Sequence, residues 1–344
     1  MNIQQLISKR IVITDSAEMI YQTFLDNGWT DGLPFIPPTE EAVAKMITQM
    51  STDPQEVVTV IPPKWGEATI EKIAINAVMA GCLPEYMPVI IAALKAMAEP
   101  RFNLSFVQPT THPCAPLVIV NGPVAKELKI NSRSGTFGPG FRSNATIGRA
   151  IRLILLNIGG AIPGDTDMST QGQPSKFSFC IAENEDENPW QPLHVEKGYD
   201  TSQSTVTVVA AENPRNINDH SSTNALDMLS TIAGNLNAMS TNNMLGQGGN
   251  PILALAPEHA ATIAREGYSK DDIKDYMFKN ATLQVGRYPL STRQRFFPNK
   301  GEEDRISLVA KKEDLIVIVV GGPGKHSSYL PSSAGNWSVT KPIE

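Results

Sequence analysis

Short clusters of proline and glycine divide this chain into apolar segments of helix or strand length. The 344 residues include 26 prolines and 25 glycines, which gather in clusters such as Gly32-Leu33-Pro34, Gly138-Pro139-Gly140 and Gly321-Gly322-Pro323-Gly324. Because proline fixes φ and glycine tolerates positive φ, these clusters predict shaped loops between regular elements. Such loops on a rigid scaffold commonly carry binding and catalytic residues, so the pattern favours an enzyme.

The N-terminal part of the chain predicts helices. Asp15 or Ser16 caps a segment whose apolar residues recur at helical spacing, and Gly28 ends it. Thr39 caps a second helix that runs to about Met50. Further helices are expected over residues 68–81, 84–98, 145–157 and 224–239, with two more between 257 and 280.

Short apolar runs later in the chain predict buried strands, at 116–120, 176–182, 205–209, 252–255 and 315–320. We therefore expect a mixed α/β (α+β) fold, with a helical N-terminal part followed by mixed sheets with flanking helices. The expected units are residues 1–66, N-terminal helices and a loop that pack on the core, 67–220, a first α/β half, and 221–344, a second half.

A weak internal echo suggests that the two halves are diverged copies around a cleft. A helix beginning at Pro84-Glu85-Tyr86 precedes the run 118–123, and one beginning at Pro257-Glu258-His259 precedes the run 317–323. Both runs are apolar and end at Gly-Pro. Chance matching of short, common words is the alternative explanation.

Charge and cysteine content narrow the functional class. Twenty-nine basic and thirty-five acidic side chains give a net charge of −6, which argues against a nucleic-acid partner. No apolar run approaches the ~18 residues that span a bilayer, and the polar start at residues 1–5 precedes no signal core. Three cysteines form no disulfide framework. We expect a cytoplasmic protein without a membrane partner, and a homo-oligomer on general frequency.

Cys82 is the first candidate for chemistry. It lies between two expected helices, at the start of the one that begins at Pro84. The positive end of a helix dipole lowers the pKa of a thiol there, whereas Glu85 in the first turn opposes that effect. The alternative is a small, buried residue at a helix corner.

A second candidate is the segment Thr110-Thr111-His112-Pro113-Cys114, which places two hydroxyls, an imidazole and a thiol before a strand. His112 can act as a general base, or pair with Cys82 as thiolate and imidazolium if the fold brings them together. A metal site of Cys82, His112 and Cys114 is a weaker alternative, because this spacing matches no zinc pattern.

Two glycine-rich loops are candidates for binding an anionic substrate. The first precedes a helix that Ser143 or Asn144 would cap, and backbone N–H groups with arginines at such a helix start bind carboxylate or phosphate. Its expected substrate-binding residues are Gly138, Gly140, Arg142, Asn144 and Arg149. The second loop follows the strand 315–320, and its expected binding residues are Lys325, His326 and Ser327.

The acidic stretch 183–187 is expected to be a solvated loop. Within it, Glu183 at the strand end is the carboxylate that could enter a site.

Three segments resemble a poorly characterised bacterial family associated with proteins that carry a UGSC (selenocysteine or cysteine) motif. The segments are Gly28-Trp29-Thr30-Asp31-Gly32-Leu33-Pro34, Ala80-Gly81-Cys82-Leu83-Pro84-Glu85-Tyr86 and Gly148-Arg149-Ala150. The resemblance extends over nearly the whole chain and implies a cytoplasmic enzyme subunit that works with a thiol- or selenol-bearing partner. This chain has no Cys-Gly-Ser-Cys of its own, so the partner's thiol chemistry is not carried over.

The sequence thus favours a small-molecule enzyme that uses Cys82, His112 and Glu85, with Thr110 and Thr111 beside the substrate. Its carboxylate would be held by Arg142 and Arg149, in a thiol-assisted lyase, hydrolase or redox reaction. The alternatives are a non-catalytic binding subunit of a complex with the thiol- or selenol-bearing protein, and a metal-dependent enzyme. We predict no cofactor, with a metal ion as the alternative.

Overall fold

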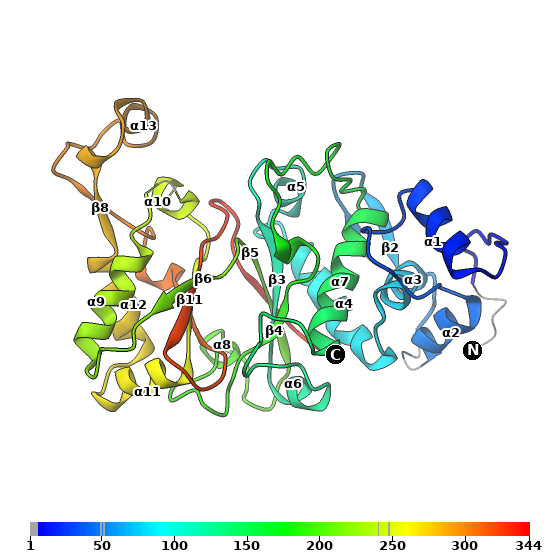
Figure 1. The fold of residues 1–344 in the computed structure, drawn as a ribbon, viewed down its shortest axis with the longest axis horizontal. Coiled ribbons are helices and arrows are strands. Elements are labelled where there is room, and N and C mark those ends of the chain that lie inside the picture. The colour runs from blue at the N-terminus through cyan, green and yellow to red at the C-terminus, as the bar shows by residue number, and fades with distance from the viewer. Residues whose placement is uncertain (1–5, 49, 51, 240, 247) are drawn as a thin grey trace.

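Two four-stranded sheets lie face to face between two layers of helices (Figure 1). The computed structural model describes residues 6–48, 50, 52–239, 241–246 and 248–344. The first sheet has the order β12-β5-β3-β4, with bounds Val339–Pro342, Thr205–Ala211, Ala115–Asn121 and Cys180–Ala182. The second has the order β10-β7-β11-β6, with bounds Ile316–Val319, Ile252–Leu255, His326–Leu330 and Arg215–Asn218. The expected mixed α/β fold is confirmed.

Alternation along the strands separates three apolar cores. In β3, Leu117 and Ile119 face the second sheet, whereas Val118 and Val120 face the helices. The facing sides of both sheets contribute to one buried cluster that includes Ile252 and Ile318. The expectation of a cleft between the two halves is therefore wrong for the facing sheets, because apolar side chains fill the space between them.

The first helical layer contains the elements expected near the N-terminus. Ser16 caps α1 by accepting a hydrogen bond from the backbone N–H of Met19. The helices here are α1 (Ala17–Asp26), α2 (Glu40–Thr48), α3 (Ile70–Ala80), α4 (Met87–Met97) and α7 (Arg142–Asn157), and a hairpin of β1 (Val57–Ile61) and β2 (Gly66–Thr69) lies among them. Apolar residues of the N-terminal segment, including Phe24 and Ile47, join the core beneath the first sheet.

The second helical layer covers the outer face of the second sheet. It consists of α9 (Ala225–Leu236), α11 (Pro257–Arg265) and α12 (Lys270–Asn280). A ribbon of β8 (Thr282–Gln284) and β9 (Arg305–Ser307) carries α13 (Leu290–Phe296) away from the body (Figure 1). The remaining short helices are α5 (Leu104–Val107), α6 (Pro123–Glu127), α8 (Leu193–Glu196) and α10 (Asn242–Gly246).

The two sheets share one topology and exchange a strand. In each sheet a parallel pair, β3 with β4 or β7 with β10, continues into two antiparallel strands. The order α4-α5-β3-α6-α7-β4-β5-β6 matches α9-α10-β7-α11-α12-β10-β11-β12, apart from α8 and the β8–β9 ribbon. The last strand of each series pairs in the other sheet, β6 with β11 and β12 with β5.

This topology assigns a different correspondence from the sequence echo. The echo aligned the run in β3 with the run in β10, but β3 is an inner strand and β10 an edge strand. By strand order β3 corresponds to β7, so Pro123 after β3 matches Pro257 after β7. The domain boundary expected at residue 220 falls between β6 and α9. The two halves on either side are nevertheless joined, because β6 and β12 each pair with a strand of the other half.

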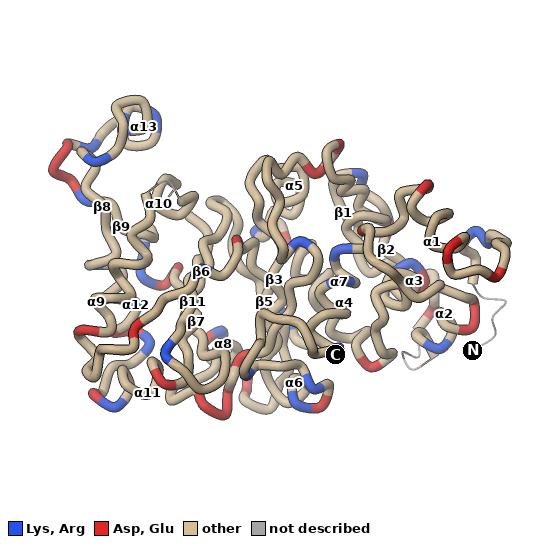
Figure 2. Tube along the Cα trace, viewed as in Figure 1, with Lys and Arg blue, Asp and Glu red and all other residues tan. Residues whose placement is uncertain are grey.

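Charged residues lie mainly in helices and connections, whereas the centres of both sheets are uncharged (Figure 2). This distribution follows from the burial of each sheet on both faces. Among the described residues, none of the helices is both long and apolar enough to cross a membrane.

Candidate functional site

Cys82 follows the C-terminus of α3, where it is buried. Its thiol donates a hydrogen bond to the carbonyl of Thr146, at a sulfur–oxygen distance of 3.2 Å. Burial raises the pKa of Cys82 to about 12, against the smaller lowering effects of that hydrogen bond and of Arg142 and Arg149. The expected thiolate is therefore wrong, because Pro84–Tyr86 forms only a short 3₁₀ turn and burial outweighs any dipole effect. Glu85 in that turn is exposed.

His112 pairs with a carboxylate, and a different thiol lies nearby. Its Nε2 lies 2.8 Å from Oε1 of Glu212, whereas its Nδ1 is buried without a hydrogen-bond partner among the described residues; the Cys114 thiol contributes to raising its pKa. β3 and β5 are antiparallel, with Ala115 opposite Ala211. Cys114, just before β3, therefore lies opposite Glu212, just after β5. Within the described part of the chain, the hydrogen bond of the Cys82 thiol goes to Thr146 and not to His112. Glu212 could not be predicted as a site residue from the sequence, because only the register between β3 and β5 places it beside His112.

The imidazole is held in its charged form. Burial lowers the pKa of His112, but the nearby Cys114 thiol and the Glu212 carboxylate outweigh it and raise the pKa to about 9. At neutral pH an imidazolium therefore lies beside the Glu212 carboxylate and near the Cys114 thiol.

This pair predicts a pH-dependent stability. The pKa of His112 is raised from 6.5 to about 9 on folding, so its contribution is complete below pH 6.5 and disappears as pH rises through 9. We expect that contribution to reach at most about 3 kcal/mol. Urea unfolding between pH 6 and 9.5 should show the free-energy difference between the protein and His112→Gln shrinking across this window. A difference that stays constant with pH would contradict the pairing.

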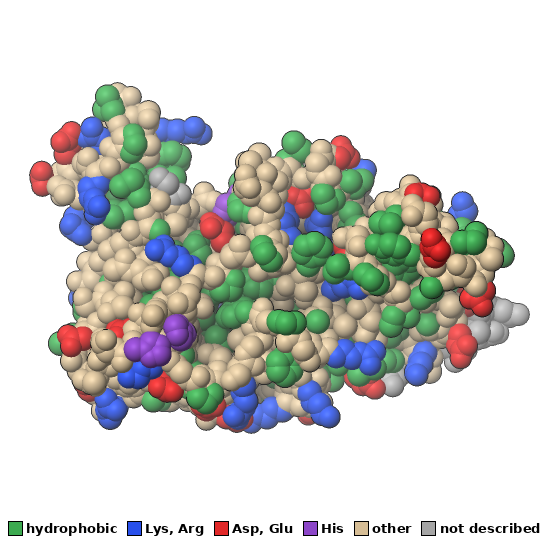
Figure 3. Space-filling model, in the orientation of Figure 1, with side chains coloured by type: hydrophobic (Ala, Val, Ile, Leu, Met, Phe, Trp, Pro, Cys, Tyr) green, Lys and Arg blue, Asp and Glu red, His purple; other side chains and the backbone are tan. Residues whose placement is uncertain are grey.

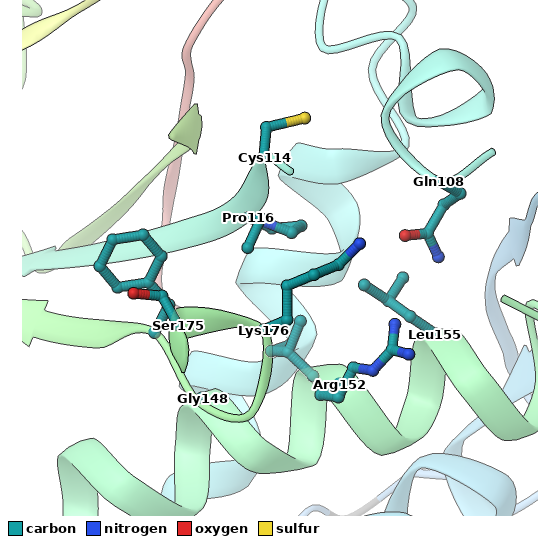
Figure 4. Close-up of a pocket in the computed structure, with 11 residues that line it drawn as sticks. Gln108, Cys114, Pro116, Gly148, Arg152, Leu155, Ser175 and Lys176 are labelled. Atoms are coloured by element: carbon teal, nitrogen blue, oxygen red, sulfur yellow. The ribbon is translucent and has the colours of Figure 1, made fainter. Parts of the chain in front are cut away.

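A small cavity of about 20 Å³ lies beside this cluster, with room for a water-sized group. α7 contributes Gly148, Ile151, Arg152 and Leu155, the i, i+3, i+4, i+7 positions of one helix face. In Figure 4 the polar groups of Gln108, Arg152 and Lys176 point toward one another, and the sulfur of Cys114, just before the start of β3, is directed away from them. The other residues around it are Ala115, Pro116, Ser175 and Phe179.

Hydrogen-bond donors dominate this cavity. Asp167, buried, holds the two cations, with Oδ1 2.7 Å from Nζ of Lys176 and Oδ2 3.3 Å from Arg152. Gln108 is 4% exposed, and its Nε2 is buried without a hydrogen-bond partner among the described residues. Arg152, Lys176 and the unpaired N–H of Gln108 face a single carboxylate, so hydrogen-bond donors are in excess. Such an excess suits the binding of a small anion.

The loop between α7 and β4 closes this region. The backbone N–H of Thr170 donates to the carbonyl of Thr111, and Nε2 of Gln173 donates to the carbonyl of Ala211. Thr110 accepts a hydrogen bond from the backbone N–H of His112. Thr110 and Thr111 thus lie near the cluster as structural supports, with Thr111 acting through its backbone.

The residues of the first glycine-rich loop have protein partners. Arg149 forms two hydrogen bonds of 2.8 Å with Asp31, and Arg142 donates to the carbonyl of Gly81. Asn144 exchanges hydrogen bonds with the backbone of Asn131. The expected cap at Ser143 or Asn144 is wrong, since α7 begins at Arg142 and Phe141 occupies the N-cap position without a side-chain bond. Gly138 and Gly140 shape the turn before it.

The three candidate binding residues of the second glycine-rich loop have different surroundings in the structure. Ser327 is buried, 2.7 Å from Nδ1 of His259, and serves the packing of β11. Lys325 donates to the carbonyl of His220, and His326 is an exposed partner of the His220 ring.

A larger cavity of about 470 Å³ lies at the carboxyl ends of β3 and β4. Its walls include Lys129, Glu183 and Glu185. Glu183, the member of the acidic stretch 183–187 that was expected to enter a site, is buried, and it accepts hydrogen bonds from Asn121, Asn188 and the backbone N–H of Leu193. Burial raises the pKa of Glu183, and the positive charge of buried Lys270 is the largest opposing effect.

Comparisons with known proteins identify no relative, since no protein family, curated protein or solved structure matches the chain. No group of three or more histidine, cysteine or acidic residues within the described part of the chain is arranged to hold a metal ion. The geometry of the residues at the start of β3 is therefore the basis for assigning a function.

Proposed function

We propose that this protein is a thiol-dependent enzyme acting on a small carboxylate-bearing substrate, with Cys114 in place of Cys82. The observation that carries the proposal is His112, which pairs with Glu212 and whose pKa is raised by the nearby Cys114 thiol. Cys114 would be the nucleophile, the His112 imidazolium the proton donor and Glu212 the orienting carboxylate.

The cavity supports the choice of substrate. Gln108, Arg152 and Lys176 would hold a carboxylate oxygen, while the rest of the molecule extends along the start of β3 toward the sulfur. The Cys114 thiolate would form a bond to an electrophilic carbon of the substrate. The displaced electron pair would take the proton of the His112 imidazolium.

The chain supplies its own thiol in this proposal, so chemistry does not depend on the thiol- or selenol-bearing partner that the family resemblance implies. Cys114 is nearly enclosed, at 1% exposure, which restricts the reaction to small reagents and substrates.

Alkylation of the native protein with iodoacetamide at pH 7 tests the proposal, with mass spectrometry of each cysteine. Cys82 and Cys180 are internal controls, because burial raises the pKa of both thiols. We expect Cys114 to react at least tenfold faster than either, and His112→Gln to slow Cys114 alone by about tenfold. A small carboxylate such as acetate should protect Cys114.

Equal, slow labelling of all three cysteines would overturn the proposal. Fast labelling of Cys114 that survives His112→Gln would remove the imidazole from the mechanism. Circular dichroism of the variant checks that a changed rate does not reflect unfolding.

A further inference from the structure

Two histidines outside the proposed catalytic cluster form a close pair on the surface. Nε2 of His220 lies 3.2 Å from Nε2 of His326, with ring centroids 5.0 Å apart and planes at 72°. Both side chains are exposed, and Figure 3 shows histidines side by side on the half that contains β6 and β11. We propose that His220 and His326 form a binding site for a divalent transition-metal ion such as Zn²⁺.

The separation of the two nitrogen atoms fits joint coordination. Zinc binds imidazole nitrogen at about 2.0–2.1 Å, so two ligands of a tetrahedral ion lie about 3.4 Å apart. The observed 3.2 Å needs only a small side-chain movement to admit the ion. The ion would replace the proton that the two rings share when no metal is bound.

A third residue holds one ring in the form that binds metal. Oδ1 of Asn216 lies 3.1 Å from Nδ1 of His326 and is an acceptor, so the ring proton belongs on Nδ1. The Nε2 lone pair of His326 is then free to face His220. Ligating histidines commonly have such a partner on the other ring nitrogen.

Sheet register makes the site rigid. β6 and β11 are antiparallel, with His326 opposite Asn218 and Ser328 opposite Asn216. Asn216 therefore lies diagonally across from His326 on one face of the sheet, within reach of its ring. His220 follows Asn218 by two residues.

The electrostatic surroundings set the strength of the site. Lys325 donates to the carbonyl of His220 and places a positive charge nearby. Asp219 is turned away, because its carboxylate accepts hydrogen bonds from Ser221 and Ser222. Two protein ligands leave the remaining positions to water, so we expect weaker binding than at a closed structural zinc site.

Isothermal titration of the tag-free protein with ZnCl₂ tests this site. We expect one ion per chain, with affinity at least tenfold lower in His220→Gln and in His326→Gln. Asn216→Asp should tighten binding by about tenfold, because a carboxylate makes the bound imidazole more basic. The thermal unfolding of each variant without metal should stay unchanged, since these side chains are exposed.

His112→Gln separates this site from zinc captured by the thiol cluster at Cys114. Unchanged binding in that variant, together with loss in His326→Gln, supports the proposal. Absence of zinc binding, or binding that is lost in His112→Gln and kept in His326→Gln, would overturn it without affecting the proposed enzyme function.

Discussion

Asp167→Asn is expected to lower the free energy of unfolding by about 3 kcal/mol and to make stability depend on added anions. The carboxylate of Asp167 is 4% exposed and pairs with Arg152 and Lys176, whose side chains are 12% and 16% exposed. Removing it leaves two largely buried cations without a counter-charge. Urea unfolding with and without sodium acetate, at constant ionic strength, measures both effects.

Acetate should restore part of the lost stability, because an anion in the cavity replaces the missing carboxylate. Asp165→Asn is the matched control, since Asp165 is an exposed neighbour in the same loop and should change stability by less than about 0.5 kcal/mol. Equal stability of the two variants, or a lack of response to acetate, would show that Arg152 and Lys176 do not form an anion site.

Gly148→Ala is expected to destabilise the protein by about 3 kcal/mol. A Cβ at Gly148 would lie 2.4 Å from both the backbone nitrogen of Phe179 and Oγ of Ser178. The backbone at Phe179 is held by β3, because its carbonyl accepts from the N–H of Val118. Helix α7 would have to move away from β4 and carry Arg152 with it, so protection of Cys114 by acetate should weaken as well.

Gly234→Ala provides a control within the same chain. Gly234 is an exposed glycine of a helix, and nothing lies within 4 Å of a Cβ added there. Alanine at this position should raise the free energy of unfolding by about 0.5–1 kcal/mol. The two substitutions, identical in chemistry, should therefore shift the urea midpoint in opposite directions, and a shift in the same direction would contradict the packing at Gly148.

Local signals predicted most helices and buried strands of this fold. Ser16 caps α1 as expected, and the apolar run near Val118 forms β3. β11 was not predicted as a strand, because His326 and two serines open it and Tyr329 and Leu330 are its only large apolar residues. β6 and β12 escaped prediction because each is completed by pairing with the other half of the chain.

The site was predicted in part, through the segment around His112 and Cys114. Burial is a tertiary property, so the sequence could not show that the pKa of Cys82 is raised. Nor could it show that Arg149 is occupied by Asp31, which lies 118 residues away along the chain. Helical spacing of Gly148 and Arg152 was the one local signal that could have placed α7 against the cavity.

The exchange of β6 and β12 affects the order in which the protein can fold during synthesis. β5, a strand of the cluster around Cys114, needs β12 to cover its outer edge, and β12 ends at Pro342. A nascent chain that has produced His112, Cys114 and Glu212 therefore still carries an unpaired strand edge, which is prone to self-association. The first half therefore reaches its final form only after residues 339–342 of the second half have been synthesised.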